Sequence, residues 1–408
     1  MSEQLLTDVP FTDFELDPRL IEGLHATGFV QCTPIQARSL PLLLAGQDVA
    51  GQAQTGTGKT AAFMLATMER LLTLKARDPG VPAQAIMLSP TRELAIQIYN
   101  DALKIGRATG LRCCLAYGGV DYDKQRNLLL DGFDIVIGTP GRIIDYCKQG
   151  VLNLRQMRVV VLDEADRMFD LGFIKDLRYL LRRMPHPTQR LTMLFSATLS
   201  FRVNELAYEH MNNPQMVEVS PDRRTAERVE QVLYHVGAEE KVALLVGLFR
   251  QLNPDRTLVF VNTKRVANEI VAYLNHNGFR AEMLSGDVIQ TKRQRLIEQF
   301  SKGEIPIVVA TDVAARGLHI PDVSHVVNFD LPQNAEDYVH RIGRTARMGA
   351  AGDAISFGCE EYVFSLQSIE EYIGAKIPVA RVDDDMMAIL KRPARSAIPQ
   401  RPPFRRRR

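Results

Sequence analysis

Residues Ala53 to Thr60 read AQTGTGKT and have the spacing of a phosphate-binding loop. Such loops follow the pattern G-x-x-x-x-G-K-[S/T], in which backbone N–H groups surround the phosphates and the lysine reaches the terminal ones. Gly58, Lys59 and Thr60 fit the last three positions, whereas Ala53 replaces the first glycine. The stretch therefore predicts a nucleoside triphosphate site with the Thr60 hydroxyl on Mg²⁺; a glycine-rich turn with a chance lysine is the alternative.

A second stretch, VVVLDEAD (159–166), makes that alternative remote. Four apolar residues predict a buried strand that ends in Asp163 and Glu164. We expect Asp163 to hold Mg²⁺ largely through its water shell, and Glu164 to orient a water for attack on the γ-phosphate. Taken alone, the acidic residues also fit the start of a helix, where negative charge is stabilising.

Hydrolysis of a nucleotide also needs positive charge near the γ-phosphate, and the loop at 53–60 contains no arginine. The stretch HRIGRTAR (340–347) offers Arg341, Arg344 and Arg347 in the second half of the chain. We expect Arg341 and Arg344 to act as arginine fingers in cis. A basic surface helix is the alternative for this stretch taken alone.

Composition narrows the class of protein. The 408 residues predict two or three domains, and 46% hydrophobic with 24% charged residues is ordinary for a soluble protein. No apolar run approaches about 18 residues, and the first residues lack the order of a signal peptide. Five cysteines without C-x-x-C spacing fit reduced thiols better than disulfides or zinc. We therefore expect a cytoplasmic protein without a membrane span.

Short β-branched runs alternate with helical stretches in both halves of the chain, which predicts two doubly wound parallel α/β sheets in tandem. Most polar clusters directly follow an apolar run, so they are expected at the carboxyl ends of strands, where ligands of such sheets gather. The expected divisions are a first domain at 1–218, a linker at 219–228, a second domain at 229–383 and a basic disordered tail at 384–408. The runs lie at 48–53, 85–90, 134–140, 158–166 and 191–198, and at 257–263, 281–286, 306–312 and 325–330.

With these motifs in order, the chain resembles a DEAD-box RNA helicase, a family of two RecA-like domains. The tetrad at 163–166 spells the family name, and PTREL (90–94), TPGR (139–142), SAT (196–198) and HRIGRTAR resemble further family motifs. Alanine at the first position of the phosphate loop is normal in this family. Two departures from the broader pattern are His319, where most members have aspartate, and Ala346, which replaces a glycine.

The resemblance implies a role for each matching residue. A Q motif at 11–36 would read adenine through a bidentate pair with Gln36, while Phe29 would stack on the base or be plain core. RNA contacts through hydroxyls, arginines and amides would be blind to sequence, although each such residue could equally be a helix cap or a surface charge. The implied ATP-binding residues are Phe11, Phe29, Thr33, Gln36, Ala53, Gln54, Thr55, Gly56, Thr57, Gly58, Lys59, Thr60 and Asp312; those coupling ATP to RNA are Asp166, Ser196 and Thr198; those binding RNA are Thr91, Arg92, Gly119, Thr139, Arg142, Arg293, Thr311 and Gly317.

The resemblance also implies the function: ATP hydrolysis on RNA binding, with Mg²⁺, and local unwinding of RNA duplexes. The nearest-looking members work in the bacterial RNA degradosome, which implies RNase E as a partner. An ATP-gated RNA clamp with little turnover is the alternative, and a DNA helicase is a third that the Q motif weakens. RNA-stimulated ATP turnover with strand displacement distinguishes the enzyme from a clamp.

The charge of the chain is concentrated at one end. Residues 391–408 carry eight positive charges and no acid, whereas the whole chain carries +2, so residues 1–390 carry −6. Arginine pairs with phosphate and stacks on unpaired bases. The tail is thus predicted to be an auxiliary RNA tether; a solubility aid or a protein contact is the alternative.

We predict that removing residues 391–408 weakens RNA binding and flattens its salt dependence, because each phosphate contact on a single strand contributes about −0.7 to the slope. Turnover at saturating RNA should stay near that of the full chain, since every catalytic candidate precedes the tail. RNA affinity measured against log salt for the full chain and for residues 1–390 tests this; equal slopes would contradict it.

Overall fold

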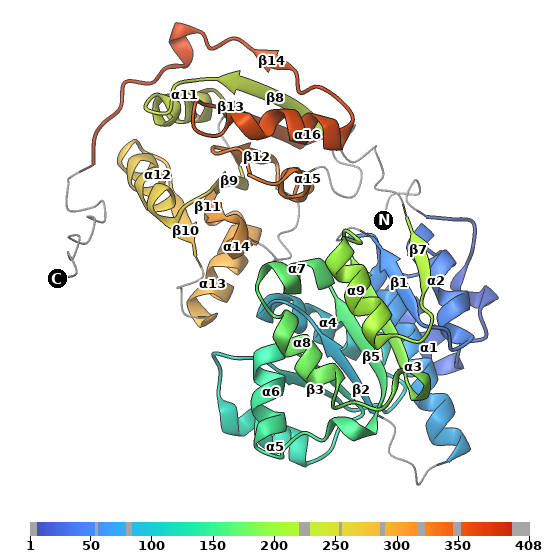
Figure 1. Ribbon diagram of the computed structural model, residues 1–408. Coiled ribbons are helices and arrows are strands. Elements are labelled where there is room, and N and C mark those ends of the chain that lie inside the picture. Colours follow the sequence, from blue (N-terminus) through green and yellow to red (C-terminus); the bar gives the residue numbers. More distant parts are fainter. Residues whose placement is uncertain are drawn as a thin grey trace, which may run out of the picture. The chain divides into compact units, whose positions relative to one another are not determined.

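Figure 1 shows the computed structural model, which describes residues 6–53, 56–78, 84–219, 229–252, 255–285, 290–315, 323–345 and 352–393. By its internal contacts the chain divides into two compact units, residues 1–221 and 222–408. Each unit has its own seven-stranded sheet. Linker residues 220–228 and the site candidates Gln54, Thr55 and Gly317 lie outside the described residues.

The first unit has seven parallel strands in the order β3-β4-β2-β5-β6-β1-β7. Alternate residues of β5 enter different cores: Val159 and Val161 pack on one face of the sheet, Val160 and Leu162 on the other. Because both faces are covered, the central strands are mostly apolar, with charged residues of β5 confined to its ends, at Arg158 and Asp163. The strands are β1 (Val49–Gln52), β2 (Gln84–Leu88), β3 (Cys113–Ala116), β4 (Ile135–Gly138), β5 (Met157–Asp163), β6 (Leu191–Ser196) and β7 (Gln215–Glu218); the helices are α1 (Pro18–Ala26), α2 (Pro34–Leu44), α3 (Lys59–Arg77), α4 (Arg92–Ile105), α5 (Tyr122–Leu130), α6 (Pro140–Lys148), α7 (Ala165–Asp170), α8 (Ile174–Leu181) and α9 (Phe201–His210).

The second unit repeats this plan with the strand order β10-β11-β9-β12-β13-β8-β14, again all parallel. Its central strand β9 also feeds two cores, with Val259 and Val261 on one face and Leu258 and Phe260 on the other. The strands are β8 (Val229–His235), β9 (Thr257–Val261), β10 (Ala281–Leu284), β11 (Ile307–Thr311), β12 (His325–Asn328), β13 (Gly352–Gly358) and β14 (Val379–Ala380); the helices are α11 (Lys241–Leu252), α12 (Lys264–His276), α13 (Gln290–Ser301), α14 (Asp312–Ala315), α15 (Ala335–Ile342) and α16 (Leu366–Ile373).

The expected fold class, two tandem RecA-like doubly wound parallel sheets, is confirmed. Five strands have no counterpart among the runs that the sequence predicts: β3, β7, β8, β13 and β14. Of these, β3, β7 and β14 are edge strands, where one side lacks a neighbouring strand and a continuous apolar run is not required. Strand β8 mixes buried with exposed positions, and β13 begins with glycine and aspartate.

The expected start of the disordered tail at residue 384 is wrong. Residues 384–391, which we call the strap, begin with a 3₁₀ turn (Asp384–Met386) and lie over α11. The Ala388 N–H donates to the Ala243 carbonyl at 3.2 Å. Asn277 and Lys391 exchange two hydrogen bonds of 2.9 and 3.0 Å. Met386, Met387 and Leu390 provide the apolar contact that a Pro- and Arg-based interpretation overlooks; residues 394–408 lie outside the described residues.

Three further findings concern membrane-spanning helices, metal sites and cysteines. Among the described residues, no helix combines the length and apolarity needed to cross a bilayer. The same part of the chain contains no group of three or more His, Cys, Asp or Glu side chains arranged to hold a metal ion. All five cysteines are free thiols.

We predict that Gly247→Ala destabilises the full chain by about 1–3 kcal/mol, the range for overpacking a filled core. A Cβ at Gly247 would lie 1.7 Å from the Met386 carbonyl oxygen, so the strap would have to move. In a chain that ends at residue 383 the same change should stabilise by up to about 1 kcal/mol, because alanine favours helix. Urea unfolding of both pairs measures this, and an equal effect in both chain lengths would contradict the packing of the strap on α11.

Candidate functional site

The strand order of the first sheet sorts the polar motifs into two neighbouring groups. Strands β5, β6 and β1 are adjacent and are followed by the DEAD tetrad, SAT and the phosphate loop. Strands β3, β4 and β2 are adjacent and are followed by Gly119, Thr139 and the pair Thr91–Arg92. All these motifs lie at the carboxyl edge of one sheet, with nucleotide candidates on one half and RNA candidates on the other.

The phosphate loop leads directly into α3, whose first residue is Lys59. Gly56 and Gly58 both have a φ of +88°, in the left-handed region that favours glycine. A Cβ at Gly58 would also lie 2.5 Å from the Gln36 amide nitrogen. Ala53 is 2% exposed and its N–H donates to the Ser196 carbonyl at 2.8 Å, so a small residue continues the strand here. The loop thus places a helix N-terminus and Lys59 where a phosphate would lie.

Lys59 and Asp163 form a buried ion pair, with Nζ and Oδ1 3.2 Å apart and the residues 4% and 1% exposed. Burial raises the pKa of Asp163 to about 6, which Lys59 offsets only in part. Burial opposes the charged form of Lys59, but the carboxylates of Asp163, Glu164 and Asp166 together raise its pKa. Within the described structure, Lys59 Nζ and Asp163 Oδ2 have no hydrogen-bond partner. An ammonium and a carboxylate oxygen left this way fit a phosphate and a hydrated Mg²⁺.

Glu164 has an unusual backbone for its residue type. Its φ of 52° and ψ of 54° are left-handed, and it is one of three non-glycine residues with positive φ in the described chain. Such a conformation costs about 1–3 kcal/mol and occurs often at functional sites. The Glu164 N–H donates to Asp163 Oδ1 at 3.0 Å, which turns the chain from β5 into α7. The Glu164 carboxylate is near enough to the Lys59–Asp163 pair to act electrostatically on both residues.

The fourth residue of the tetrad connects two strands. Asp166 Oδ2 accepts from the N–H groups of Ala197 and Thr198 at 3.1 and 3.2 Å, while the Asp166 N–H donates to Ser196 Oγ at 3.1 Å. The structure therefore brings together the three residues predicted to couple ATP to RNA. Thr198 takes part through its backbone.

The residues of the Q motif are mostly buried. Phe11 is 2% exposed and belongs to the main core, whereas Phe29 is only partly buried against it. Gln36 Oε1 accepts from the Thr33 N–H at 2.7 Å, and its Nε2 donates to the Gly58 carbonyl at 2.9 Å. These bonds leave one lone pair and one N–H of the amide, the number that a bidentate adenine contact needs. Gln36 thus ties the start of α2 to the phosphate loop, a link that sequence spacing did not indicate.

The RNA candidates of the first unit include one helix cap and one aromatic cluster. Thr91 Oγ accepts from the Leu94 N–H at 3.3 Å and caps α4. Arg142 lies 5.0 and 5.6 Å from the ring centres of Tyr122 and Tyr146, and donates to the Tyr146 hydroxyl at 3.3 Å. The sequence analysis missed both tyrosines, although Tyr146 follows Arg142 at the i+4 spacing that places residues side by side on a helix.

Two further candidates of this group are in contact. A Cβ at Gly119 would lie 2.2 Å from an Arg92 guanidinium nitrogen, and Gly119 has a φ of +85°. Gly119 is therefore favoured by its left-handed backbone, whereas the flexible Arg92 side chain near it could move aside. Thr139 precedes α6 without a side-chain cap bond.

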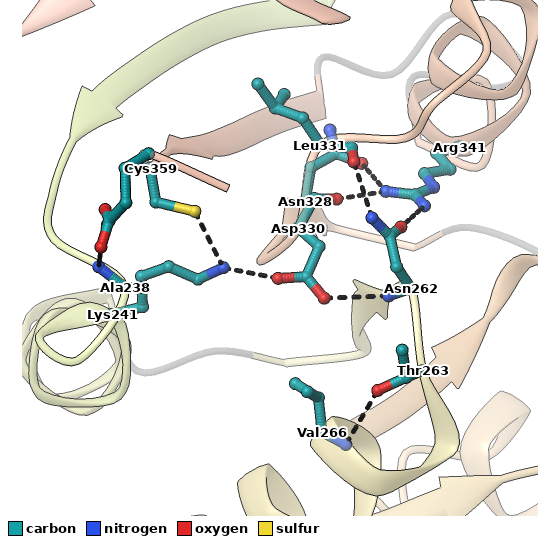
Figure 2. Close-up of polar contacts among 11 residues, drawn as sticks. Ala238, Lys241, Asn262, Thr263, Val266, Asn328, Asp330, Leu331, Arg341 and Cys359 are labelled. Atoms are coloured by element: carbon teal, nitrogen blue, oxygen red, sulfur yellow. Dashed lines mark hydrogen bonds and ion pairs between the residues drawn. The ribbon is translucent and has the colours of Figure 1, made fainter. Parts of the chain in front are cut away.

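In the second unit, Arg341, expected to act as an arginine finger, has no N–H group left for a phosphate in the described structure. All five of its N–H groups donate within the unit: two to the Asp312 carboxylate, and one each to Asn262 Oδ1, Asn328 Oδ1 and the Asp330 carbonyl, at 2.6–3.3 Å. Figure 2 shows how the last three acceptors surround it. Arg341 is 1% exposed. We therefore propose a structural role for Arg341, and Asp312, expected to bind ATP, accepts two of its five hydrogen bonds.

The same network extends to a second buried cation. Asp330 forms an ion pair with Lys241 Nζ and accepts from the Asn262 N–H at 2.9 Å (Figure 2). Lys241 and Asp330 are 3% and 2% exposed. These residues lie on β9, β12 and α11 and next to them, far apart in sequence, so no local pattern indicated them.

The other candidates of the second unit lie on one strand end and on or after two helices. Thr311 ends β11 and is 9% exposed. Arg293, on α13, donates to the Ala314 carbonyl at 2.8 Å. Arg344, 7% exposed, follows α15. The predicted Arg347 and the departures His319 and Ala346 lie outside the described residues.

Comparison with known families agrees with this geometry. A family described as DEAD/DEAH box helicase matches residues 33–207, and one described as helicase conserved C-terminal domain matches residues 240–349. The chain belongs to the DEAD-box RNA helicases, and it is an ATP-hydrolysing RNA helicase that binds ATP and RNA.

Among curated proteins, it is 57% identical to the ATP-dependent RNA helicase RhlB of Vibrio campbellii over 94% of this chain and 88% of that protein. It is 54% identical to RhlB of Aliivibrio salmonicida over 100% of this chain and 94% of that protein. Among solved structures, S. cerevisiae Dbp5 bound to RNA and ADP BeF3 is 32% identical with a TM-score of 0.78, over 91% of this chain and 95% of that one. Mss116p bound to ssRNA and AMP-PNP is 30% identical with a TM-score of 0.79, over 92% and 80%.

We predict that Glu164→Gln lowers ATP turnover by roughly 10² to 10⁴ while ATP and RNA still bind, because the amide cannot act as a base. The surface change Glu205→Gln, on α9, is the control and should leave turnover unchanged. Steady-state ATPase and equilibrium binding measure the two effects. Turnover near the unmodified level in a clean preparation would defeat the assignment of Glu164.

We predict that Arg341→Lys lowers the free energy of unfolding by about 2–4 kcal/mol, because buried acceptors lose their donors and an ammonium cannot reproduce the planar fork. Arg381→Lys, at a side chain that is 90% exposed, should have no such effect. Denaturation in urea compares them. A loss of turnover with unchanged stability would restore the finger role of Arg341.

Proposed function

We propose that the enzyme couples ATP hydrolysis to local melting of RNA duplexes and acts in RNA degradation. The observation that carries the proposal is the bonding of Asp166 to Ala197 and Thr198, because it joins the hydrolytic tetrad on β5 to the coupling motif on β6. Any shift of the tetrad on hydrolysis is therefore passed to the neighbouring strand. An enzyme built this way can release RNA once per ATP.

For the hydrolytic step, Lys59 binds the terminal phosphates and Glu164 orients the attacking water. Bound Mg²⁺, held by Asp163 through water and by Thr60, would neutralise charge on the phosphates. We assign positive charge from the second unit to Arg344, with Arg347 as a further candidate. The N–H and the lone pair that the Gln36 amide has left pair with adenine, and Phe29 packs on the base.

For the RNA side, the sequence-blind contacts come from Arg92, Gly119, Thr139 and Arg142, with Arg293, Thr311 and Gly317 from the second unit. The stack of Arg142 on two tyrosines supports this role, since it fixes the guanidinium for phosphate. Thr91 contributes chiefly by capping α4. We propose that ATP and RNA together draw the two units closed, and that the bent strand excludes its partner.

The likeness to RhlB proteins supports two further parts of the proposal: a cytoplasmic location and a place in the degradosome, with RNase E as partner. The direct test compares ATP turnover with and without single-stranded RNA, and strand displacement on a short duplex. RNA-stimulated turnover with displacement is expected. ATP-dependent RNA retention with little turnover would show a clamp instead. Failure of the purified chain to bind RNase E would remove the degradosome part alone.

We predict that Gln36→Ala lowers the discrimination between ATP and GTP by about 1–3 kcal/mol, the contribution of a bidentate base contact. The measurement is the ratio of kcat/KM for ATP to that for GTP. Because Gln36 also bonds to Gly58, KM for both nucleotides should rise. A rise in both values with an unchanged ratio would mean that Gln36 only supports the loop.

A further inference from the structure

The described part of the first unit has a cavity at the edge of the sheet opposite to the nucleotide motifs. Its volume is about 660 Å³, within the range of small-molecule sites. The lining includes Arg155, just before β5, Arg158, at its start, and Arg182 and Arg183, which follow α8. Arg158 and Asp163 lie at opposite ends of β5, roughly 16 Å apart at about 3.3 Å per residue. This cavity is therefore separate from the ATP site.

The charge of the cavity is uncompensated. None of its lining residues is an acid, and within the described residues none of the four arginines forms an ion pair. Arg155, Arg182 and Arg183 are exposed, so solvent screens part of the repulsion among the four charges, and a bound anion would relieve the rest. The concentration stands out because residues 1–390 carry a net charge of −6.

The dipole of α8 accounts for only two of the four arginines. Arg182 and Arg183 follow the carboxyl end of α8, where the helix dipole favours cations. Arg155 and Arg158 belong to a 3₁₀ turn (Leu154–Gln156) and a strand, where no such effect operates. The helix dipole does not explain why arginines from two chain segments line the same cavity. A bound anion would explain it.

One of the arginines is already held in place. The Arg183 guanidinium lies 3.5 Å from the ring centre of Tyr179 and donates to the Tyr179 carbonyl at 3.0 Å. Lys148 Nζ lies 5.9 Å from the same ring and adds another positive charge nearby. Fixing the guanidinium beforehand lowers the entropy lost when a ligand binds.

We propose that this cavity is a second anion site, which binds phosphate groups. A phosphate offers several oxygens to several planar guanidinium forks at once, which matches four arginines better than a single carboxylate does. The phosphate could belong to the backbone of an RNA segment that extends beyond the carboxyl edge of the sheet, or to a free polyphosphate or nucleotide. The proposal is independent of the roles assigned at the ATP site.

The test uses the full chain with its ATP site filled by AMP-PNP and Mg²⁺. The variant is Arg155→Ala with Arg183→Ala, and the matched control is Arg77→Ala with Arg107→Ala, two exposed arginines elsewhere in the first unit. One probe is inorganic tripolyphosphate, followed by calorimetry. The other is single-stranded RNA of about 10 and about 40 nucleotides, followed by fluorescence anisotropy against salt. A second variant, Arg155→Lys with Arg183→Lys, keeps the charge and removes the forks, so a folding defect of the alanine variant does not block the test.

We expect the alanine variant to bind tripolyphosphate at least tenfold more weakly, with the lysine variant between it and the control. If the ligand is RNA, the longer strand alone loses affinity, and its salt slope falls by about 1.4 for two lost contacts. If only tripolyphosphate binding falls, the phosphate site takes a small ligand. Equal binding of both probes by the alanine variant and the control overturns the proposal, as does binding of poly-glutamate without any binding of phosphate.

Discussion

The buried ion pair between Lys59 and Asp163 is the interaction on which the first unit is organised. Two charges with so little exposure are tolerated only in each other's presence, and removing one partner from such a pair typically costs about 3–5 kcal/mol. The pair joins the start of α3 to the end of β5. It can form only because β6 lies between β1 and β5 and fixes their separation. The strand order, the glycines of the phosphate loop and the turn at Glu164 together bring Lys59 close to Asp163.

The two units use buried charge in different ways. Arg341 has every donor satisfied by groups of its own unit, so nothing remains for a ligand. Lys59 and Asp163 each keep a polar atom without a hydrogen-bond partner among the described residues. A fully bonded buried cation stabilises a fold, whereas an incompletely bonded one is ready for a ligand. A structural cation and a ligand-binding cation are thus told apart by the number of their hydrogen bonds, which the residue type alone does not reveal.

This difference explains what the sequence could and could not predict. The apolar runs, such as VVVL before Asp163, reveal buried parallel strands because both faces of each sheet are covered. The motifs after them fall at one edge for the same reason. The bonding of Arg341 was not predicted because its acceptors, on or beside β9, β11 and β12, meet only through the strand order. The strap was missed because its packing depends on the facing Gly247, which no local composition indicates.

The strap also has a consequence for the order in which the protein is completed during synthesis. Domains generally fold as units, beginning with the amino-terminal one, while the chain grows. The sheet of the first unit is complete once its last strand, β7, ends at residue 218. In the second unit the cover of α11 comes from residues 384–391, which are made long after the helix itself. The apolar face of α11 therefore stays uncovered while residues 253–383 are synthesised, and a ribosome that stalls within that stretch leaves a complete first sheet and a second unit with an exposed helix face.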